Sequence, residues 1–241
     1  MMERYSTIDK KYKREIVFLK ARPCRWGKCR FCDYIEDNEI NEEKIDKINK
    51  KVLRKITGKY GVVEVIDSAS FFELTEKTKK MIKEIVDEKN IHTLFFECHW
   101  IYRNKVHEIR EYFKNQKIII KTGVETFDND FRENYLKKGA GFKDYKEVLK
   151  YFDSPCLMVG IKGQTKDMID RDMDIILNNF NHATVNVFNN NSTDVKRDDK
   201  LVDWFLNKYH QRLISNEKID YLYNITDFGV GWWKMSLEDI L

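Results

Sequence analysis

The sequence predicts an α/β fold built on a parallel sheet. Short apolar runs that are typical of strands alternate six times with segments whose apolar residues recur at helical spacing. Strands that alternate with helices pair in parallel through right-handed crossovers. The 241 residues suit a single domain, and six strand–helix units are too few to close an eight-stranded barrel. We expect a core over about residues 15–190 and a C-terminal extension over about 194–241.

The strands are predicted from short apolar runs bounded by turn residues. The first strand rests on the run Ile16-Val17-Phe18-Leu19, and Gly58 and Gly61 punctuate the chain before the second. The six predicted strands cover about residues 15–20, 62–66, 93–96, 117–121, 156–159 and 184–188. Residues 1–14 are polar and basic, so we expect them to form an arm over the barrel rim or a short disordered lead.

The helices are predicted from apolar residues that share one face. After the first strand, Ile45, Ile48 and Val52 recur at intervals of three and four. The later helical segments are expected near residues 74–86, 102–113, 128–137, 143–152, 166–180 and 198–210. An aromatic-rich tail, residues 221–233, follows the last of these helices.

Composition and charge limit the classes of function. The net charge of +4 is modest, and the 44 basic residues are interleaved with 40 acidic ones, which does not favour nucleic-acid binding. No apolar run approaches the roughly 20 residues that span a bilayer, and the N-terminus has no apolar signal core. We therefore expect no membrane association and a cytoplasmic location, where thiols stay reduced.

Three of the five cysteines lie within nine residues, in the spacing C-x4-C-x2-C. Cys24, Cys29 and Cys32 follow the first strand, and thiolates this close in sequence can converge on one metal centre. Three thiolates favour an iron–sulfur cluster over a closed zinc site, which needs a fourth ligand. A zinc site completed by His99 or His107 remains the alternative. An odd number of cysteines in a short loop argues against disulfides.

The stretch from Arg22 to Asp33 resembles the cluster loop of the radical S-adenosylmethionine (radical SAM) enzymes. Their commonest spacing is C-x3-C-x2-C with an aromatic residue before the last cysteine, a position that Phe31 fills here. The first spacer is one residue longer, and Gly27 can absorb the extra residue. The resemblance implies a partial (β/α)6 TIM-like barrel with a parallel sheet, a [4Fe-4S] cluster on Cys24, Cys29 and Cys32, and S-adenosyl-L-methionine (SAM) as cofactor. It covers about residues 15–188.

The same resemblance implies a SAM site across the ends of successive strands. The stretch Gly123-Val124-Glu125-Thr126 looks like a family segment whose carboxylate receives ribose hydroxyls or an ammonium, and Val159 to Thr165 looks like the segment beside adenine. The expected cofactor-binding residues are Phe31, Ser68, Ser70, Lys121, Glu125, Ile161, Asn186 and Phe188. Each has a plainer interpretation: the serines as helix caps, Glu125 as a solvated loop carboxylate, and Phe188 as core.

Substrate contacts are expected where the third strand ends. We expect Glu97, His99 and Trp100 to face the barrel mouth, although His99 can equally be a hydrogen-bonded structural histidine. A carboxylate such as Glu97 can accept hydrogen bonds from the amino and ring N–H groups of a deazaguanine. Asp227, with the tail residues Trp232 and Trp233, offers a carboxylate and a stacking surface for a planar ring. Alternatively, these aromatic residues close the barrel.

The leading hypothesis is a radical SAM enzyme that acts on a small planar molecule. A 5′-deoxyadenosyl radical from SAM would abstract hydrogen from the substrate, and the resemblance implies a reducing partner such as flavodoxin or ferredoxin. The small size, the lengthened cysteine spacer and the carboxylates at the mouth resemble what is expected of the queuine lyases, which release a 7-deazapurine from queuine. Two alternatives remain: a radical SAM activase or maturase that acts on a protein, and a zinc-stabilised module that binds RNA through the basic cysteine loop.

Overall fold

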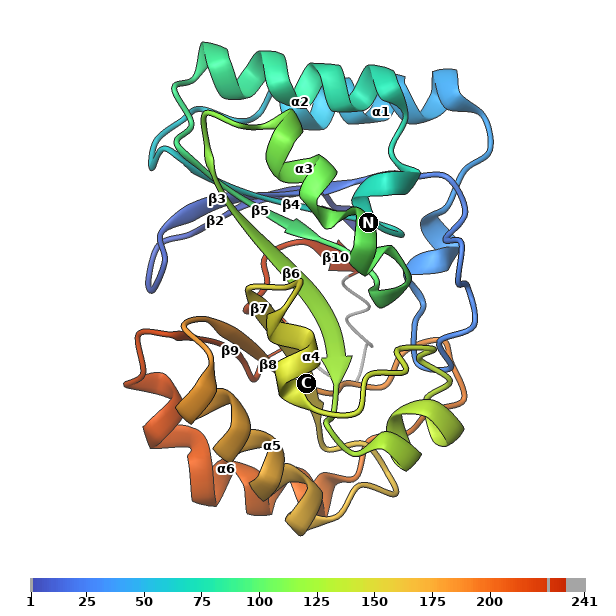
Figure 1. Ribbon diagram of the computed structural model, residues 1–241, viewed down its shortest axis with the longest axis vertical. Coiled ribbons are helices and arrows are strands. Elements are labelled where there is room, and N and C mark those ends of the chain that lie inside the picture. The colour runs from blue at the N-terminus through green and yellow to red at the C-terminus, as the bar shows by residue number, and fades with distance from the viewer. Residues whose placement is uncertain (1, 225, 233–241) are drawn as a thin grey trace, which may run out of the picture.

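The computed structural model describes residues 2–224 and 226–232, and its main feature is a curled sheet of eight strands (Figure 1). The strand order is β2-β3-β4-β5-β6-β7-β8-β9. All neighbours from β3 to β9 pair in parallel, and β2 pairs with β3 antiparallel. The strands are β2 (Tyr5–Ile8), β3 (Arg14–Leu19), β4 (Val62–Asp67), β5 (Thr93–Glu97), β6 (Lys117–Glu125), β7 (Ser154–Val159), β8 (Ala183–Val187) and β9 (Ile219–Leu222). The predicted partial barrel, with its six parallel strands, is confirmed.

Helices cover the outer face of this half-barrel (Figure 1). The α-helices are α1 (Glu42–Leu53), α2 (Glu76–Glu88), α3 (Val106–Tyr112), α4 (Tyr145–Leu149), α5 (Lys166–Asn179) and α6 (Asp199–Ile214). Short turns are η1 (Tyr34–Asp37), η2 (Phe71–Glu73), η3 (Trp100–Lys105) and the π-helical η4 (Phe131–Tyr135). Side chains cap the helix starts: Asn41 accepts from the Lys44 amide before α1, and Thr75 accepts from the Thr78 amide before α2. None of the helices in the described residues is long and apolar enough to cross a membrane.

Three expectations about the elements need correction. Residues 2–14 form neither an arm over the rim nor a disordered lead, because they contain β1 (Met2–Glu3) and β2, which extend the sheet system. The segment 128–137 holds one π-helical turn, since the buried Arg132 binds the carbonyl oxygens of Thr126, Ala140 and Phe142 and folds the loop around itself. The C-terminal extension adds β9, a strand too short to stand out by its apolar pattern.

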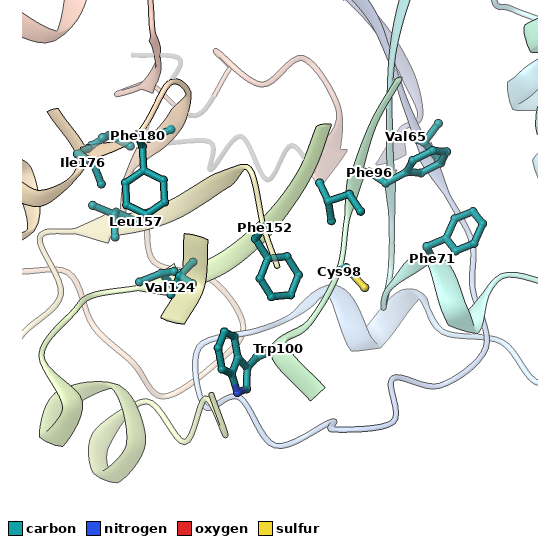
Figure 2. Packing of buried hydrophobic residues seen from close by; sticks show 14 of the residues in the cluster. Val65, Phe71, Phe96, Cys98, Trp100, Val124, Phe152, Leu157, Ile176 and Phe180 are labelled. Atoms are coloured by element: carbon teal, nitrogen blue, oxygen red, sulfur yellow. The ribbon is translucent and has the colours of Figure 1, made fainter. Parts of the chain in front are cut away.

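The main core lies between the outer face of the sheet and the helices. Strand side chains alternate, so Ile118, Ile120 and Val124 of β6 pack outward while the residues between them face the concave side. Figure 2 shows part of this core, where Cys98 and Trp100 lie among buried phenylalanines. Trp100 contacts Phe142 and Phe152, with ring centroids 5.1 and 5.9 Å apart. The expectation that Trp100 faces the barrel mouth is therefore wrong.

The floor of the half-barrel, near the amino ends of the strands, is a buried network of charges. Arg14 on β3 binds Glu64 on β4 at 2.5 Å and Asp220 on β9 at 2.7 Å. Lys121 on β6 binds the other oxygen of Glu64 at 2.6 Å. Because β3 and β9 lie toward opposite edges of the sheet, these pairs join the two edges and hold the curl.

The C-terminal segment runs across the open side of the half-barrel. It leaves β9 at one edge and ends in β10 (Gly231–Trp232), which pairs with β1 beside the other edge. On the way, Phe228 lies 5.9 Å from the Lys121 ammonium, and Val230 packs with Phe18 and Ile66 on the concave face. The described part of the extension thus covers the inside of the floor. It does not cover the carboxyl ends of the strands, where a site can form.

Candidate active site

The three clustered cysteines follow β3 at the carboxyl rim of the sheet. The loop turns at Gly27, whose φ of +58° lies in the left-handed region that glycine adopts without strain. Asn38 anchors the loop, since it accepts from the Cys24 amide at 3.2 Å and donates to the Ser68 carbonyl at 2.9 Å. The extra residue in the first spacer is therefore accommodated by this glycine turn.

The cysteine thiols are half-buried, unpaired by disulfides and electrostatically coupled to one another. Burial raises the pKa of Cys29 to about 12 and that of Cys32 to about 11, while the nearby Lys138 ammonium acts in the opposite direction. The thiols would therefore stay protonated in water-filled surroundings unless a metal centre replaced their protons.

The donor set fits an iron–sulfur cluster better than a single ion. Across residues 2–224 and 226–232, no three His, Cys, Asp or Glu side chains are gathered as the ligands of one metal ion would be. A cube-shaped cluster is wider than one ion, so its three thiolate ligands stand further apart. Cys24, Cys29 and Cys32 offer three thiols on one loop at the rim.

Neither histidine supports the zinc alternative. The ring nitrogens of His99 are both occupied, one by the Lys138 carbonyl at 2.9 Å and the other by the Ile101 amide at 3.2 Å. Burial, with help from the Lys138 charge, lowers the pKa of His99 to about 3, so the ring is neutral. His107 lies on α3 in the outer layer, beside a hollow of about 460 Å³ that is remote from the cysteines. His99 is thus a structural histidine in the described chain, not a free base.

Glu125 and Lys138 form a buried ion pair beside the cysteines. The Lys138 ammonium lies 2.7 Å from the Glu125 carboxylate and 5.5 Å from the centre of the Phe31 ring. Burial alone would lower the pKa of Lys138, but Glu125 and the Cys29 sulfur raise it, so the side chain is charged. Glu125 has a φ of +64°, unusual for a residue with a side chain, and such strain is concentrated at functional sites. A Cβ atom at Gly123 would lie 2.2 Å from the Glu125 carboxylate, which explains the glycine.

Lys138 is a candidate site residue that the sequence pattern did not indicate. Lys138 lies in the segment Tyr135-Leu136-Lys137-Lys138-Gly139, and this position is all that the sequence says of it. In the structure, the Arg30 amide donates to the Leu136 carbonyl at 2.9 Å, which attaches this segment to the cysteine loop. Two adjacent lysines look alike in a sequence. Only the fold shows that Lys138 is buried and Lys137 exposed.

The two serines after β4 use their hydroxyls inside the protein. The Ser68 hydroxyl accepts from the Ala21 amide at 3.0 Å, and the Ser70 hydroxyl accepts from the His99 amide at 2.9 Å. Both residues are buried, and their hydrogen bonds connect the ends of neighbouring strands. Each hydroxyl thus accepts a hydrogen bond from the backbone of a neighbouring strand end.

An apolar wall stands on the opposite part of the rim. Ile161 and Phe188 are buried in one cluster with Met158, and Phe31 packs against it. Gln164 shapes the Ile161 loop by accepting from the amides of Gly160 and Ile161, each at 2.9 Å. Asn186 is the one exposed residue of β8 and faces the concave side, where its side chain has no hydrogen bond within the described residues.

Glu97 ends β5 and faces the inside of the half-barrel. Within the part of the chain that the structure describes, its carboxylate has neither a hydrogen bond nor an ion pair, although the charges of Lys121 and Lys138 both act on it. Burial raises its pKa. The phenol of Tyr34, two residues after Cys32, lies near this carboxylate and packs on Phe18 at a ring distance of 5.2 Å.

Two other predicted residues lie away from the rim. Lys121 is wholly buried in the floor and bound to Glu64, so its ammonium is already paired. Asp227 accepts from the amides of Tyr223 and Asn224 at 2.9 and 2.8 Å and so stabilises a turn. Trp233, which was expected to offer a stacking surface to a planar ring, lies outside the described residues, and so does the Trp232 side chain.

Comparison with known proteins identifies the family. The solved structure of the queuine lyase from Clostridium spiroforme, bound to SAM and queuine, superposes with a TM-score of 0.93. Its sequence is 54% identical, and the match covers 96% of this chain and 100% of that one. The beta subunit of archaeosine synthase from Methanosarcina acetivorans is 22% identical over an alignment of 142 residues, and the match covers 54% of this chain and 41% of that protein. The match thus spans less than half of that relative's length, and no protein-family model matches. With the cysteine loop at the rim of a half-barrel, this likeness shows that the chain belongs to the queuine lyases, a family of radical SAM enzymes.

Proposed function

We propose that this chain binds a [4Fe-4S] cluster through Cys24, Cys29 and Cys32, binds SAM across the rim, and cleaves queuine to release a 7-deazapurine. When bound and reduced, such a cluster supplies the electron that splits SAM into methionine and a 5′-deoxyadenosyl radical. The protein's own contribution is to position both ligands and to exclude water.

Both polar and apolar residues of the rim would contact SAM. The Glu125 carboxylate can accept from ribose hydroxyls or an ammonium while Lys138 holds it in place. Ile161 and Phe188 offer an apolar wall to adenine, and Asn186 offers an unpaired amide. The burial and pairing of Lys121 argue against its role as a partner for the SAM carboxylate.

The single observation that supports the substrate is the unpaired Glu97 carboxylate inside the half-barrel. The Glu97 carboxylate is half-buried and its pKa is raised by burial, so a ligand that supplies donors would stabilise its charged form. The amino group and ring N–H of a 7-deazaguanine are two adjacent donors in one plane, which match the two carboxylate oxygens. The related queuine lyase, whose structure contains SAM and queuine, agrees with this assignment.

We also propose a cytoplasmic location and a protein reductant such as flavodoxin or ferredoxin. All five cysteines are free thiols, and a reducing compartment keeps them so.

Anaerobic reconstitution tests the proposal. The protein, loaded with iron and sulfide and given SAM, dithionite and queuine, should produce 5′-deoxyadenosine together with a released 7-deazapurine base, both detected by mass spectrometry. Queuine should increase 5′-deoxyadenosine above the level with SAM alone. A reconstituted protein that cleaves SAM but leaves queuine intact would refute the substrate, and one that binds no iron would refute the cluster.

A further inference from the structure

The buried ammonium of Lys138 lies between the cysteine loop and the end of β6. It is 5.5 Å from the centre of the ring of Phe31, the residue before Cys32, and 2.7 Å from the Glu125 carboxylate. Gly123 allows this approach to β6, since a Cβ atom there would lie 2.5 Å from the Lys138 Nζ atom. A cation is thus held beside the thiols that would bind the cluster.

The backbone of Lys138 is fixed from two sides. Its amide donates to the Arg132 carbonyl at 3.1 Å. Its carbonyl oxygen lies 2.9 Å from Nε2 of His99, and because Nδ1 of that ring accepts from the Ile101 amide, Nε2 of the neutral ring carries the proton and donates it. The start of the side chain is therefore fixed by the backbone, and the Glu125 carboxylate fixes its other end.

The ion pair of Lys138 and Glu125 directs its positive end toward the cysteines. Burial raises the pKa of Cys29. Among the charges around this thiol, the Lys138 ammonium, which lowers that pKa, acts more strongly than the Glu125 carboxylate, which raises it. Burial also raises the pKa of Cys32, and the Lys138 charge again acts in the opposite direction. At the cysteine sulfurs the pair therefore acts as a positive charge, although its two members cancel at a greater distance.

We infer that Lys138 raises the reduction potential of the cluster, an inference that rests on the proposed function. A reduced cluster carries one more negative charge than an oxidised one, so a cation buried beside it favours the reduced state. Water and salt screen an exposed charge, but they screen a buried one much less. Lys138 would therefore make the cluster easier to reduce, and SAM cleavage begins with the electron that the cluster receives.

A plainer role for Lys138 is to hold Glu125 for its contact with SAM. That role predicts weaker SAM binding in Lys138 variants but no change in the potential of a cluster measured without SAM. Tuning by charge instead predicts shifts of opposite sign when the cation and the carboxylate are neutralised separately. The sign of the shift distinguishes the two roles, because the loss of a shared structural contact does not depend on which partner is removed.

A redox titration of the reconstituted protein without SAM, followed by electron paramagnetic resonance of the reduced cluster, measures the potential. In Lys138→Gln the equilibrium should move about tenfold toward the oxidised cluster, which lowers the potential of a one-electron couple by about 59 mV. In Glu125→Gln the potential should rise by a smaller amount, because the carboxylate acts on the thiols more weakly. The matched control is Lys137→Gln, which removes the exposed charge of the neighbouring residue and should leave the potential unchanged.

A double variant covers the case in which Lys138→Gln leaves Glu125 buried without a partner and loses the cluster. Glu125→Gln/Lys138→Met replaces the ion pair with two neutral side chains, so no charge is left unpaired. Its potential should lie below that of Glu125→Gln, which keeps the cation.

Several results would overturn the tuning role. One is an unchanged potential in Lys138→Gln, or in the double variant relative to Glu125→Gln. Others are a shift of the same sign in Lys138→Gln and Glu125→Gln, and a potential in Glu125→Gln at or below the wild-type value. A wild-type protein that binds no iron and sulfide would instead refute the proposed cluster, whereas failure of the tuning role leaves a cluster with a measured potential.

Discussion

Two inward-facing carboxylates at the rim differ in whether they have a partner. Glu125 is fixed by Lys138 at 2.7 Å, while Glu97 lies between Lys121 and Lys138 without a bond to either. A carboxylate that is paired within the protein keeps a fixed position for a defined contact. A carboxylate without such a partner can still accept hydrogen bonds from a ligand. At the scale of single residues, this difference agrees with the proposed assignment of Glu125 to the cofactor and Glu97 to the substrate.

Replacing Glu97 tests its role toward the substrate. Glu97→Gln should fold, keep its iron and bind SAM, but queuine binding should weaken by about 2–5 kcal/mol, because one acceptor becomes a donor that faces the donors of the base. Calorimetry with queuine and the yield of released base measure this. Normal turnover by the variant would contradict the assignment, and so would unfolding, which would indicate a purely structural carboxylate.

The corresponding change at Glu125 should affect SAM instead. Glu125→Ala should retain the iron content of the wild type and bind SAM at least about tenfold more weakly, because a charge-assisted hydrogen bond contributes about 1.5–3 kcal/mol. Glu108→Ala, which removes an exposed carboxylate from α3, is the control. Unchanged affinity for SAM in calorimetry would remove Glu125 from the site.

At the scale of elements, the loop after β3 and the segment after β5 contain cysteines with different surroundings. Cys29 lies in a loop anchored by hydrogen bonds to the ends of neighbouring strands, whereas Cys98 packs in the core on the outer face of the sheet. A thiol that faces the helices cannot reach a centre at the rim.

Iron and sulfide analysis distinguishes the two positions. Cys29→Ala should lose the cluster and its brown colour. Cys98→Ala should keep both and lose only about 1 kcal/mol of stability from the small cavity. A full cluster in Cys29→Ala, or its absence in Cys98→Ala, would contradict the cluster assignment.

The packing of α5 against the end of β6 should make stability depend on pH. Asp172 on α5 accepts from the Phe127 amide at 2.8 Å, and burial raises its pKa to about 7. The folded state therefore binds more protons than the unfolded state between about pH 4 and pH 7, so this carboxyl lowers stability as the pH rises through that range.

Asp172→Asn removes the titration and keeps the acceptor. Above pH 7 the variant should be more stable than the wild type, by up to about 4 kcal/mol, and near pH 4 the two should be alike. Urea denaturation at several pH values measures the difference, with the exposed Asp174→Asn of the same helix as control. A variant less stable than the wild type at pH 8 would show that the charged form is favoured.

At the scale of the whole molecule, the buried network in the floor holds the curl of the sheet. Arg14, Glu64, Lys121 and Asp220 come from four different strands, and the network joins the two edges of an otherwise open barrel. At the same end, the Lys11 ammonium binds the carbonyl of Leu213 at 2.6 Å and so attaches the β2–β3 turn to the end of α6. The rim at the other end depends on this closure for its shape.

Removing the central cation should destabilise the protein. Arg14→Met leaves Glu64 and Asp220 buried with less compensation and should cost about 3–5 kcal/mol in urea denaturation. The matched control, Arg110→Met, breaks the exposed pair with Asp153 and should cost less than about 1 kcal/mol. Equal effects of the two substitutions would show that the floor network does not stabilise the fold.

The network also predicts sensitivity to acid. Burial would raise the pKa of Asp220, but contact with His182 and the charge of Arg14 hold it well below the usual value. Its contribution to stability is therefore present above about pH 4 and is lost as the pH falls below that value. In Arg14→Met, the loss of stability below pH 4 should be smaller than in the wild type.

The sequence alone determined the elements and the chemistry of the cysteine loop. Strands and helices follow from periodic apolar residues, and the cysteines are close enough in sequence for their spacing to indicate a shared centre. These are local properties, because they depend on residues that are neighbours in the sequence.

Only the tertiary structure decided which of those side chains are free to act. Lys121 is neutralised by Glu64, 57 positions away, and Glu125 by Lys138 across a folded loop. His99 loses both ring nitrogens to backbone groups, and Trp100 turns outward into the core because the chain leaves β5 through η3. Among residues 2–224 and 226–232, the same packing leaves Glu97 without a hydrogen bond or ion pair. Partners of buried charges come from distant segments, and burial sets the energetic cost of leaving a charge unpaired, so no local pattern contains this information.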